Sequence, residues 1–426
     1  MRVLVIGSGG REHAIAWRLA RSASVTEVLA VPGNPGIERI GRCLPGNAND
    51  PAEMAALAES VGANLVVVGP EAPLVAGVAD ALRAKGIAVV GPSAAAARLE
   101  GSKFFAKAFM ERSGVPTAAY AAVDNESDAL QALNHFSCPV VLKADGLAAG
   151  KGVIIARDKA EAQAAVRGLL SGRMVGPAGA RVVIEEYLTG EEVSFIVLTD
   201  GTDATVLEPT QDHKAAGDGD TGPNTGGMGA YCDSRILSDE QRREVLDTII
   251  HPVLARMRAE GHPFTGFLYA GLMMTDSGPR VLEFNVRLGD PETQAIMHSM
   301  DADFGVVLMA AARGSLGGAR LTCQREPSVC VVMASAGYPG PYKGGCVISG
   351  IDEAEAENAV VFHAGTRKGM AGIETAGGRV LGVTASGPDL SAAIAHAYKA
   401  VDRIHFEGGW CRRDIGKKGL IRWPGF

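Results

Sequence analysis

Several features are scarce in this sequence, and each scarcity narrows the range of functions. Aromatic residues make up only 5% of the chain, which argues against stacking platforms for single-stranded nucleic acid. Seven cysteines without a C-x-x-C pair argue against a disulfide frame or a zinc site and favour a reducing compartment. The net charge of −7 gives no general affinity for phosphate backbones. Any anionic ligand must therefore be met by a local cluster of basic groups.

Long apolar segments are also missing. The apolar run Phe304–Ala312 is far too short to cross a bilayer. Met1 leads directly into an apolar strand pattern, without a basic region or a small-residue cleavage site. We therefore expect a cytoplasmic protein that binds neither membrane nor nucleic acid. The length of 426 residues predicts two or three domains with substantial cores.

Glycine, by contrast, is abundant at 55 residues, and the most informative glycine-rich stretch is Pro139–Ile155. Its two β-branched runs on either side of a small-residue turn predict an antiparallel hairpin. Glycines in such a turn let backbone N–H groups approach a phosphate closely. The turn carries three glycines between two flanking lysines: Lys143, Gly146, Gly150, Lys151 and Gly152.

This stretch differs from a P-loop. Only three residues separate Gly146 from Gly150, and Gly152 stands where a P-loop carries Ser or Thr. A P-loop also opens a helix, whereas this chain returns to a strand. We therefore expect a phosphate cradle built on strands, with a flexible hairpin tip and two solvated lysines as the alternative.

The first hundred residues alternate short β-branched runs with helical patterns. The runs are Val3–Ile6, Val28–Val31, Leu65–Val68 and Ala88–Val90. This alternation predicts a doubly wound parallel sheet, in which the loops after the strands face one crevice. Candidate ligand contacts in these loops are Gly9, Gly10, Arg11, Glu12, Asn34, Pro70 and Glu71.

A dinucleotide site is not expected in that sheet. The G-x-G-x-x-G pattern requires a third glycine where this chain has Glu12, and no acidic residue ends the second run. The helix start can still bind a monophosphate through its amides and its dipole. Tight turns that serve only the topology are the alternative.

The middle of the chain supplies further candidates. Ser102–Ser113 has helical spacing, Arg181–Tyr187 and Val193–Leu198 have strand patterns, and Glu192 between these two strands is placed to meet a ribose. The alternative interpretation is that Glu192 and the two glutamates of Arg181–Tyr187 belong to a solvated surface. Gln211–Tyr231 has almost no apolar pattern and predicts a long substrate loop that orders on binding, or else a disordered linker. Its candidates are Asp212, His213 and Lys214.

A row of polar side chains lies in Arg280–Leu288. Strand periodicity places Glu283, Asn285 and Arg287 on one face. Glu and Asn oxygens are ligands that Mg²⁺ accepts, and Arg287 is then near a phosphoryl oxygen. The polar face of an ordinary edge strand is the alternative. A turn with Asp290 follows, and the last hundred residues contain apolar runs and a helix, Leu390–Ile404, that predict a small α+β domain.

With these residues assembled, the chain resembles the phosphoribosylamine–glycine ligase (glycinamide ribonucleotide synthetase) family of the ATP-grasp superfamily. The resemblance spans essentially the whole chain. It rests on VLVIGSGGREHA, VVGPEAPL, EGSKFFAK, VLKADGLAAGKGV, IEEYLTGEEVSF, QDHKAAGDGDTGPNTGGMGAY, LEFNVRLGDPETQ, GYPG and FHAGT, in that order.

The resemblance implies an α/β and α+β architecture in three parts. The expected bounds are 1–102 for the N-terminal doubly wound α/β substrate domain, 103–325 for the central ATP-grasp catalytic domain with a small lid at about 118–190, and 326–426 for the C-terminal α+β domain.

The resemblance also implies the activity and the residues behind it. The family joins glycine to 5-phosphoribosylamine through a glycyl phosphate, with ATP and Mg²⁺ or Mn²⁺, in purine biosynthesis. Lys103 and Lys143 are expected on phosphates, Arg287 on the acyl phosphate, and Glu283 and Asn285 on the metal. Glu185, Glu186, Tyr187, Leu188 and Glu192 are expected on the nucleoside, and Asp212, His213, Lys214 and Asp290 on the substrates. The alternative is another ATP-grasp carboxylate–amine ligase or a carboxylase, and we expect a monomer or a weak homodimer.

Overall fold

The computed structural model describes residues 1–146, 152–172, 181–319, 321 and 326–422. Its N-terminal part contains a five-stranded sheet in the order β3-β2-β1-β4-β5, and every strand pair in it is parallel. The strands are β1 (Arg2–Gly7), β2 (Glu27–Pro32), β3 (Arg42–Cys43), β4 (Leu65–Val68) and β5 (Ala88–Val90). Helices on both faces bury β1, β2, β4 and β5, so the runs of these four strands are continuously apolar rather than alternating. The predicted doubly wound sheet is confirmed.

Five helices accompany this sheet, and a sixth leads out of it. They are α1 (Gly10–Ala20), α2 (Pro51–Ser60), α3 (Glu71–Val75), α4 (Val78–Ala84), α5 (Ala94–Gly101) and α6 (Lys103–Ser113). Ser102 caps α6 by accepting a hydrogen bond from the N–H of Phe105, and Gly114 ends the helix in a left-handed conformation. This is the helix that the spacing of Ser102–Ser113 predicts.

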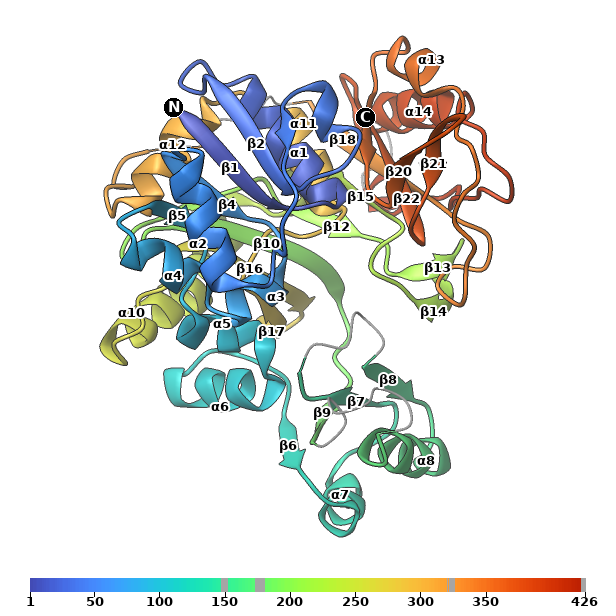
Figure 1. The fold of residues 1–426 in the computed structure, drawn as a ribbon. Coiled ribbons are helices and arrows are strands. Elements are labelled where there is room, and N and C mark those ends of the chain that lie inside the picture. The colour runs from blue at the N-terminus through green and yellow to red at the C-terminus, as the bar shows by residue number, and fades with distance from the viewer. Residues whose placement is uncertain (147–151, 173–180, 320, 322–325, 423–426) are drawn as a thin grey trace.

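The next part is a separate four-stranded sheet, which stands apart from the rest of the molecule in Figure 1. Its order is β6-β9-β7-β8, from β6 (Tyr120–Val123), β7 (Val140–Ala144), β8 (Val153–Ala156) and β9 (Val182–Glu186). Helices α7 (Glu126–Ala132) and α8 (Lys159–Leu170) pack on it around a core of their own. The expected antiparallel hairpin is confirmed, since Val141 of β7 pairs with Ile155 of β8.

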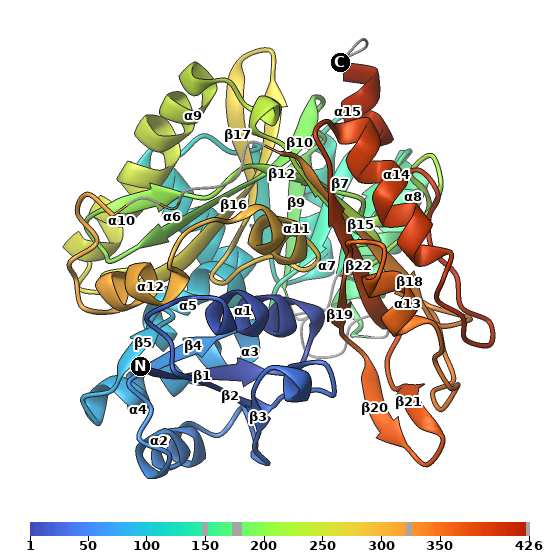
Figure 2. The ribbon, with the colours of Figure 1, turned by 90° about the horizontal axis from the view of Figure 1, so that it is seen from above.

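A nine-stranded sheet forms the centre of the molecule, in the order β17-β16-β10-β12-β15-β18-β22-β19, with β11 paired to β10. The strands are β10 (Glu191–Thr199), β11 (Ala204–Val206), β12 (Thr210–Asp212), β15 (Gly229–Cys232), β16 (Gly266–Thr275), β17 (Gly278–Asn285), β18 (Ser328–Ala334), β19 (Val360–His363) and β22 (Arg379–Ser386). The helices α9 (Asp239–Val245), α10 (His251–Ala259), α11 (Glu292–Ser299) and α12 (Phe304–Ala312) accompany it, and Figure 2 shows α11 and α12 on the side of the N-terminal sheet.

The segment 211–231 differs from the expected irregular loop. It contains the ends of β12 and β15 and a two-stranded hairpin, β13 (Ala215–Gly217) and β14 (Thr221–Asn224). The strands are short and several contain Gly or Thr, so they carry no apolar alternation. β13 and β14 pair with each other, whereas β15 pairs with β18, about a hundred residues onward. The prediction of a long loop is therefore wrong.

The C-terminal part continues the central sheet instead of forming an isolated one. The apolar runs in this part of the sequence are Ser328–Ala334, Cys346–Ile348, Val360–His363 and Arg379–Thr384. The first, third and fourth form β18, β19 and β22, while Cys346–Ile348 contributes only a single bridge from Val347 to Glu374. The remaining elements are α13 (Ile351–Glu355), β20 (Thr366–Gly369), β21 (Gly372–Thr375), α14 (Leu390–Val401) and α15 (Lys417–Arg422). Among the described residues, no helix has both the length and the hydropathy that crossing a membrane requires.

Candidate active site

The four-stranded sheet β6-β9-β7-β8, which we call the lid sheet, meets the rest of the chain at a buried pair of lysines. Lys143 on β7 and Lys107 on α6 each place Nζ 3.0 Å from the same Glu185 oxygen, Oε2. Lys143 Nζ also donates to the carbonyl of Leu282 on β17 at 2.9 Å. The carboxylate of Glu185 is 2% exposed. One buried anion therefore holds Lys143 at the junction of the lid, α6 and the edge of the central sheet.

Two lysines at this junction have pKa values below the usual value for lysine. Burial lowers the pKa of Lys107 to about 8, although the Glu185 carboxylate opposes the shift. Burial also lowers the pKa of Lys103, and Glu283 partly opposes that effect. Lys103 Nζ donates to the carbonyl of Gly146 at 3.2 Å, at the start of the glycine turn.

The glycine turn itself is described at both of its ends. Ala144 N–H donates to the carbonyl of Gly152 at 2.8 Å, and Gly152 is buried. The Asp145 carboxylate accepts from Ser102 Oγ at 3.0 Å and from the N–H of Phe104 at 3.2 Å. These bonds tie the turn to the start of α6. Two predicted contacts, Gly150 and Lys151, lie outside the described residues.

Facing the lysines, Glu283 lies half-buried on β17. Burial would raise its pKa, but Lys214, Lys143, Lys103 and Arg287 outweigh burial and hold the pKa below the usual value. Within the described part of the chain, no hydrogen bond or ion pair engages this carboxylate. A charged carboxylate without a partner among the described residues is a suitable ligand for a divalent cation.

Asn285 and Arg287 complete the predicted polar row, although β17 ends at Asn285 and Arg287 lies beyond the strand. Arg287 Nη2 donates to Asn285 Oδ1 at 3.1 Å and to Glu100 Oε1 at 2.6 Å, and its Nε donates to Glu71 Oε2 at 3.2 Å. The three side chains are therefore on one side, as predicted. Glu283 and Asn285 present the hard oxygens that Mg²⁺ or Mn²⁺ accepts, so the donor set fits such an ion.

A third group of charges comes from β12 and the residues after it. Lys214 Nζ forms an ion pair with Glu192 Oε2 at 2.9 Å. Burial raises the pKa of Asp212 to about 7, opposed by Lys214 and reinforced by Glu292 and Glu192. Burial would lower the pKa of Lys214, but Asp212, Glu192 and Glu283 hold it above the usual value.

His213 has a different environment from its neighbours. Its side chain is fully buried, and its Nε2 accepts from the N–H of Gly416 at 3.4 Å. Alternation along an extended segment directs it away from Asp212 and Lys214. The structure does not bring His213 together with the other predicted substrate contacts.

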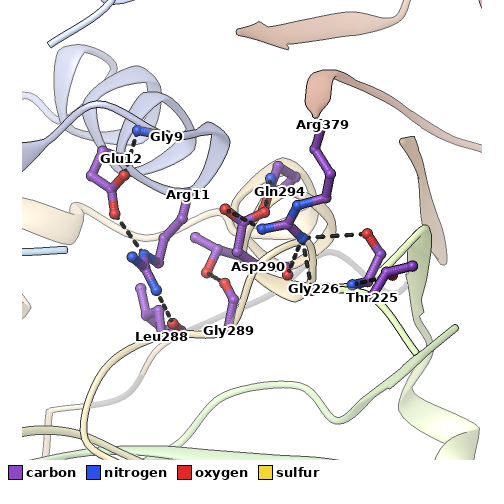
Figure 3. A network of polar contacts seen from close by, with 12 residues as sticks. Gly9, Arg11, Glu12, Thr225, Gly226, Leu288, Gly289, Asp290, Gln294 and Arg379 are labelled. Atoms are coloured by element: carbon purple, nitrogen blue, oxygen red, sulfur yellow. Dashed lines mark hydrogen bonds and ion pairs between the residues drawn. The ribbon is translucent and has the colours of Figure 1, made fainter. Parts of the chain in front are cut away.

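The N-terminal loops reach the turn after β17, as Figure 3 shows. Arg11 Nη1 donates to the carbonyl of Leu288 at 3.1 Å, and its Nε donates to Glu12 Oε1 at 2.6 Å. Glu12 Oε2 accepts from the N–H of Gly9 at 2.6 Å. A Cβ on Gly69 would lie 2.2 Å from Glu12 Oε1, so the loop after β4 leaves no room for a side chain there.

Asp290 lies on the opposite side of the same turn. Its carboxylate accepts from Gln294 Nε2 at 2.9 Å and lies 3.4 Å from Arg379 Nη2 on β22. Arg379 Nη1 also donates to the carbonyls of Asp290 and Gly226, each at 2.7 Å (Figure 3). Arg379 thus joins three segments that are distant in sequence at the predicted substrate side of the cleft.

The remaining predicted contacts lie around this cleft. Gly10 begins α1, and Pro70 precedes Glu71 at the start of α3. Asn34 Nδ2 donates to the carbonyls of Ser8 and His363 at 2.8 and 2.9 Å. At the end of β9, the Glu186 carboxylate pairs with Arg280 at 3.1 Å. In the connection to β10, Tyr187 is 44% exposed and Leu188 follows it.

Sequence reasoning missed several residues of the cleft. Lys107 and Glu100 lie in the same EGSKFFAK stretch as Lys103, so the helical spacing of the two lysines was an available signal. Arg379 carries no local signal, because its partners are about ninety and one hundred and fifty residues away. Tyr269 OH donates to Glu292 Oε1 at 2.7 Å and lines the same buried network.

A lid sheet whose hairpin lysine meets an acid–amide strand of a second sheet is the arrangement of an ATP-grasp protein. Family models for phosphoribosylglycinamide synthetase match the chain over residues 1–100 (N domain), 101–293 (ATP-grasp (A) domain) and 328–418 (C domain). The chain therefore belongs to the phosphoribosylglycinamide synthetase family.

Individual relatives agree with this membership. Phosphoribosylamine–glycine ligase of Xylella fastidiosa is 51% identical over 426 residues, which cover 99% of each chain. The enzyme of that name from Pseudomonas aeruginosa is 48% identical over the full length of both chains. The crystal structure of phosphoribosylamine–glycine ligase from Thermotoga maritima has a TM-score of 0.85 at 34% identity, covering 97% of this chain and 100% of that one.

More distant structures share the fold alone. Biotin carboxylase from Campylobacter jejuni superimposes with a TM-score of 0.73 at 16% identity, covering 99% of this chain and 95% of that one.

Proposed function

We propose that this chain is a cytoplasmic, ATP-dependent ligase that joins glycine to 5-phosphoribosylamine in purine biosynthesis. The products are glycinamide ribonucleotide, ADP and phosphate. Relatives that are about half identical over their full length carry the name of this activity. The single structural observation that carries the proposal is the meeting of Lys143 with β17 beside Glu283, which brings basic groups of the lid to an acid–amide strand.

The reaction has two steps. The glycine carboxylate takes the γ-phosphoryl group of ATP, which forms glycyl phosphate and releases ADP. The amine of phosphoribosylamine then attacks the acyl carbon, loses a proton and displaces phosphate, which leaves an amide. Both nucleophiles belong to the substrates, so the protein's contribution is positioning and charge stabilisation.

The nucleotide is assigned to the junction of the lid and the central sheet. Lys103 and Lys143 bind the phosphates, and the glycine turn from Gly146 to Gly152 covers them, with Gly150 and Lys151 as further contacts. The backbone of Glu185–Leu188 reads the base, and Glu192 meets the ribose. Closure of the lid, which we place at about residues 118–190, excludes water that would hydrolyse the acyl phosphate.

Glu283 and Asn285 would hold Mg²⁺ or Mn²⁺ on the phosphate side of the cleft. Such an ion neutralises phosphate charge during transfer. Arg287 stabilises the acyl phosphate, because its guanidinium reaches the same side as Asn285 and is fixed by Glu71 and Glu100.

The second substrate is assigned to the other side of the cleft. The loops with Gly9, Gly10, Arg11, Glu12, Asn34 and Pro70–Glu71 bind phosphoribosylamine together with Asp290. Asp212 and Lys214 lie beside its amine, and a carboxyl with a pKa of about 7 can accept the amine proton at neutral pH. We further propose a monomer or a weak homodimer as the working unit.

The test is ADP release by the purified chain. We expect release that requires both glycine and freshly prepared phosphoribosylamine, with glycinamide ribonucleotide identified by mass spectrometry. Bicarbonate in place of glycine gives no turnover. Because biotin carboxylases share this fold, ADP release with bicarbonate and without glycine would instead establish a carboxylase and overturn the proposal.

A further inference from the structure

The chain's C-terminal segment, residues 411–422, packs against the β13–β14 hairpin. Arg412 lies at the centre of this contact with a side chain that is 1% exposed. Its Nη1 donates to the carbonyl of Ala215 at 2.9 Å and to Asp220 Oδ1 at 3.0 Å. A buried guanidinium that binds a backbone carbonyl fixes that carbonyl in place, because leaving it unpaired costs free energy.

Two cations, Arg412 and Lys418, and two carboxylates, Asp220 and Asp414, form ion pairs around the tip of the β13–β14 hairpin. Asp414 accepts from both Nε and Nη2 of Arg412, each at 2.7 Å, and also from the N–H of Gly219 at 2.8 Å. Lys418 pairs with the second oxygen of Asp220 at 2.7 Å. Asp220 has a φ of 57°, a conformation that side chains rarely adopt, so two cations hold a strained residue at the turn.

The hairpin begins immediately after Lys214, and the same segment holds both neighbours of that lysine. Ala215 is bound by Arg412, and His213 accepts from the N–H of Gly416 at 3.4 Å. The carbonyl of Lys214 accepts from the N–H of Thr225 at 2.7 Å, which closes the base of the hairpin. These bonds fix the backbone on both sides of Lys214, and so the point from which its side chain reaches Glu192 Oε2, 2.9 Å from Nζ.

We propose that Arg412 is a positioning residue for the ligase reaction: it holds the β13–β14 hairpin and so aims Lys214 at the second substrate. The inference rests on the proposed function, because it gives the C-terminal segment a role in the same site. Arg412 itself touches no substrate. Its effect is exerted through the backbone of Ala215 and the fixed turn at Asp220.

The experiment measures steady-state kinetics of Arg412→Gln beside the control Arg413→Gln. The Arg413 side chain is 56% exposed and pairs with Asp402, so its loss leaves the hairpin bonded. For Arg412→Gln we expect a KM for phosphoribosylamine at least tenfold higher and a KM for ATP within twofold of the parent. If Arg412→Gln instead destabilised the whole protein, the KM values for phosphoribosylamine and ATP would both rise or both stay unchanged. Equal kinetics for the two variants would overturn the inference.

A double variant separates this inference from the proposed function. In a Lys214→Ala background, Arg412→Gln should add less than a twofold further loss, because the residue that it positions is gone. A full additional tenfold loss would overturn the inference. If Arg412→Gln is normal while Lys214→Ala is impaired, only the positioning role fails. If Lys214→Ala has normal kinetics, the assignment of Lys214 in the proposed function fails, and the positioning role fails with it.

A second variant, Asp220→Gly, tests the positioning role independently if Arg412→Gln does not fold. Asp220→Gly removes one acceptor of Arg412 and the partner of Lys418, while glycine adopts a positive φ without strain. We expect a phosphoribosylamine KM about fivefold higher, with faster hydrogen exchange confined to 215–224. An unchanged KM despite the faster exchange would show that the hairpin does not position the site.

Discussion

Replacing Glu185 by glutamine should loosen the lid. The substitution keeps the shape of the side chain but removes the anion that lies 3.0 Å from both Lys107 Nζ and Lys143 Nζ. At an effective dielectric of 20, one such pair is worth roughly 5 kcal/mol. The free energy lost is smaller than the Coulomb energy of two such pairs, because a buried lysine can release its proton.

That release sets the size of the effect. The pKa of Lys107 is already lowered to about 8 by burial, and losing Glu185 lowers it further, so Lys107 becomes neutral at neutral pH. Releasing a proton at neutral pH from a lysine with a pKa of about 8 costs about 1 kcal/mol, so the Lys107 pair contributes only that much. At the Lys143 pair, the hydrogen bond that the glutamine oxygen accepts from the ammonium offsets about 3 of the roughly 5 kcal/mol. We therefore expect a loss of about 3 kcal/mol in the local stability of the lid junction.

Hydrogen exchange measured by mass spectrometry reports this loss of local stability directly. A loss of about 3 kcal/mol makes the amides of β7 and β9 exchange about a hundredfold faster. ATP affinity, measured by calorimetry, should fall at the same time because Lys143 is no longer held. Glu186→Gln is the matched control, since Glu186 is 39% exposed and its ion pair with Arg280 is worth less than about 1 kcal/mol. Exchange in β7 and β9 within threefold of that control would refute the reasoning.

Three further outcomes are expected. Glu283→Ala should lower metal-dependent turnover by orders of magnitude with an unchanged circular dichroism spectrum, and near-normal activity would remove Glu283 from the metal. Arg287→Lys should reduce kcat more than ATP affinity because a point charge loses the guanidinium fork, and an unchanged kcat would exclude Arg287 from the chemistry. The pKa of Asp212, raised to about 7, should give a rate that rises with pH through 7 as the carboxylate forms, and Asp212→Asn should abolish that limb; its persistence in the variant would assign the limb to another group.

Local signals were sufficient for much of the fold. The runs around Lys143 form a hairpin because β-branched residues flank a glycine turn, and each of these features acts within a few residues. The N-terminal sheet follows in the same way from apolar runs buried on both faces. The polar row on β17 was predictable because Glu283 and Asn285 lie two positions apart on a strand.

Other features depend on partners that the sequence does not place. The strands of 211–231 form because β12 pairs with β10 and β15, and β15 pairs with β18, about a hundred residues onward. The shared carboxylate of Glu185 requires α6 to contact the lid sheet, which no periodicity indicates. His213 was predicted beside the substrates because its neighbours are charged, yet the C-terminal segment covers its ring.

The unbroken central sheet limits how this chain can be divided. Residues before 322 and after 325 contribute adjacent strands, since Gly229–Cys232 pairs residue by residue with Ser328–Val331. Separating the two parts there would expose the buried edges of β15 and β18, and each fragment would be prone to aggregate through its edge. The lid has a sheet and a core of its own, so it is the piece of this molecule that can be exchanged with that of a relative.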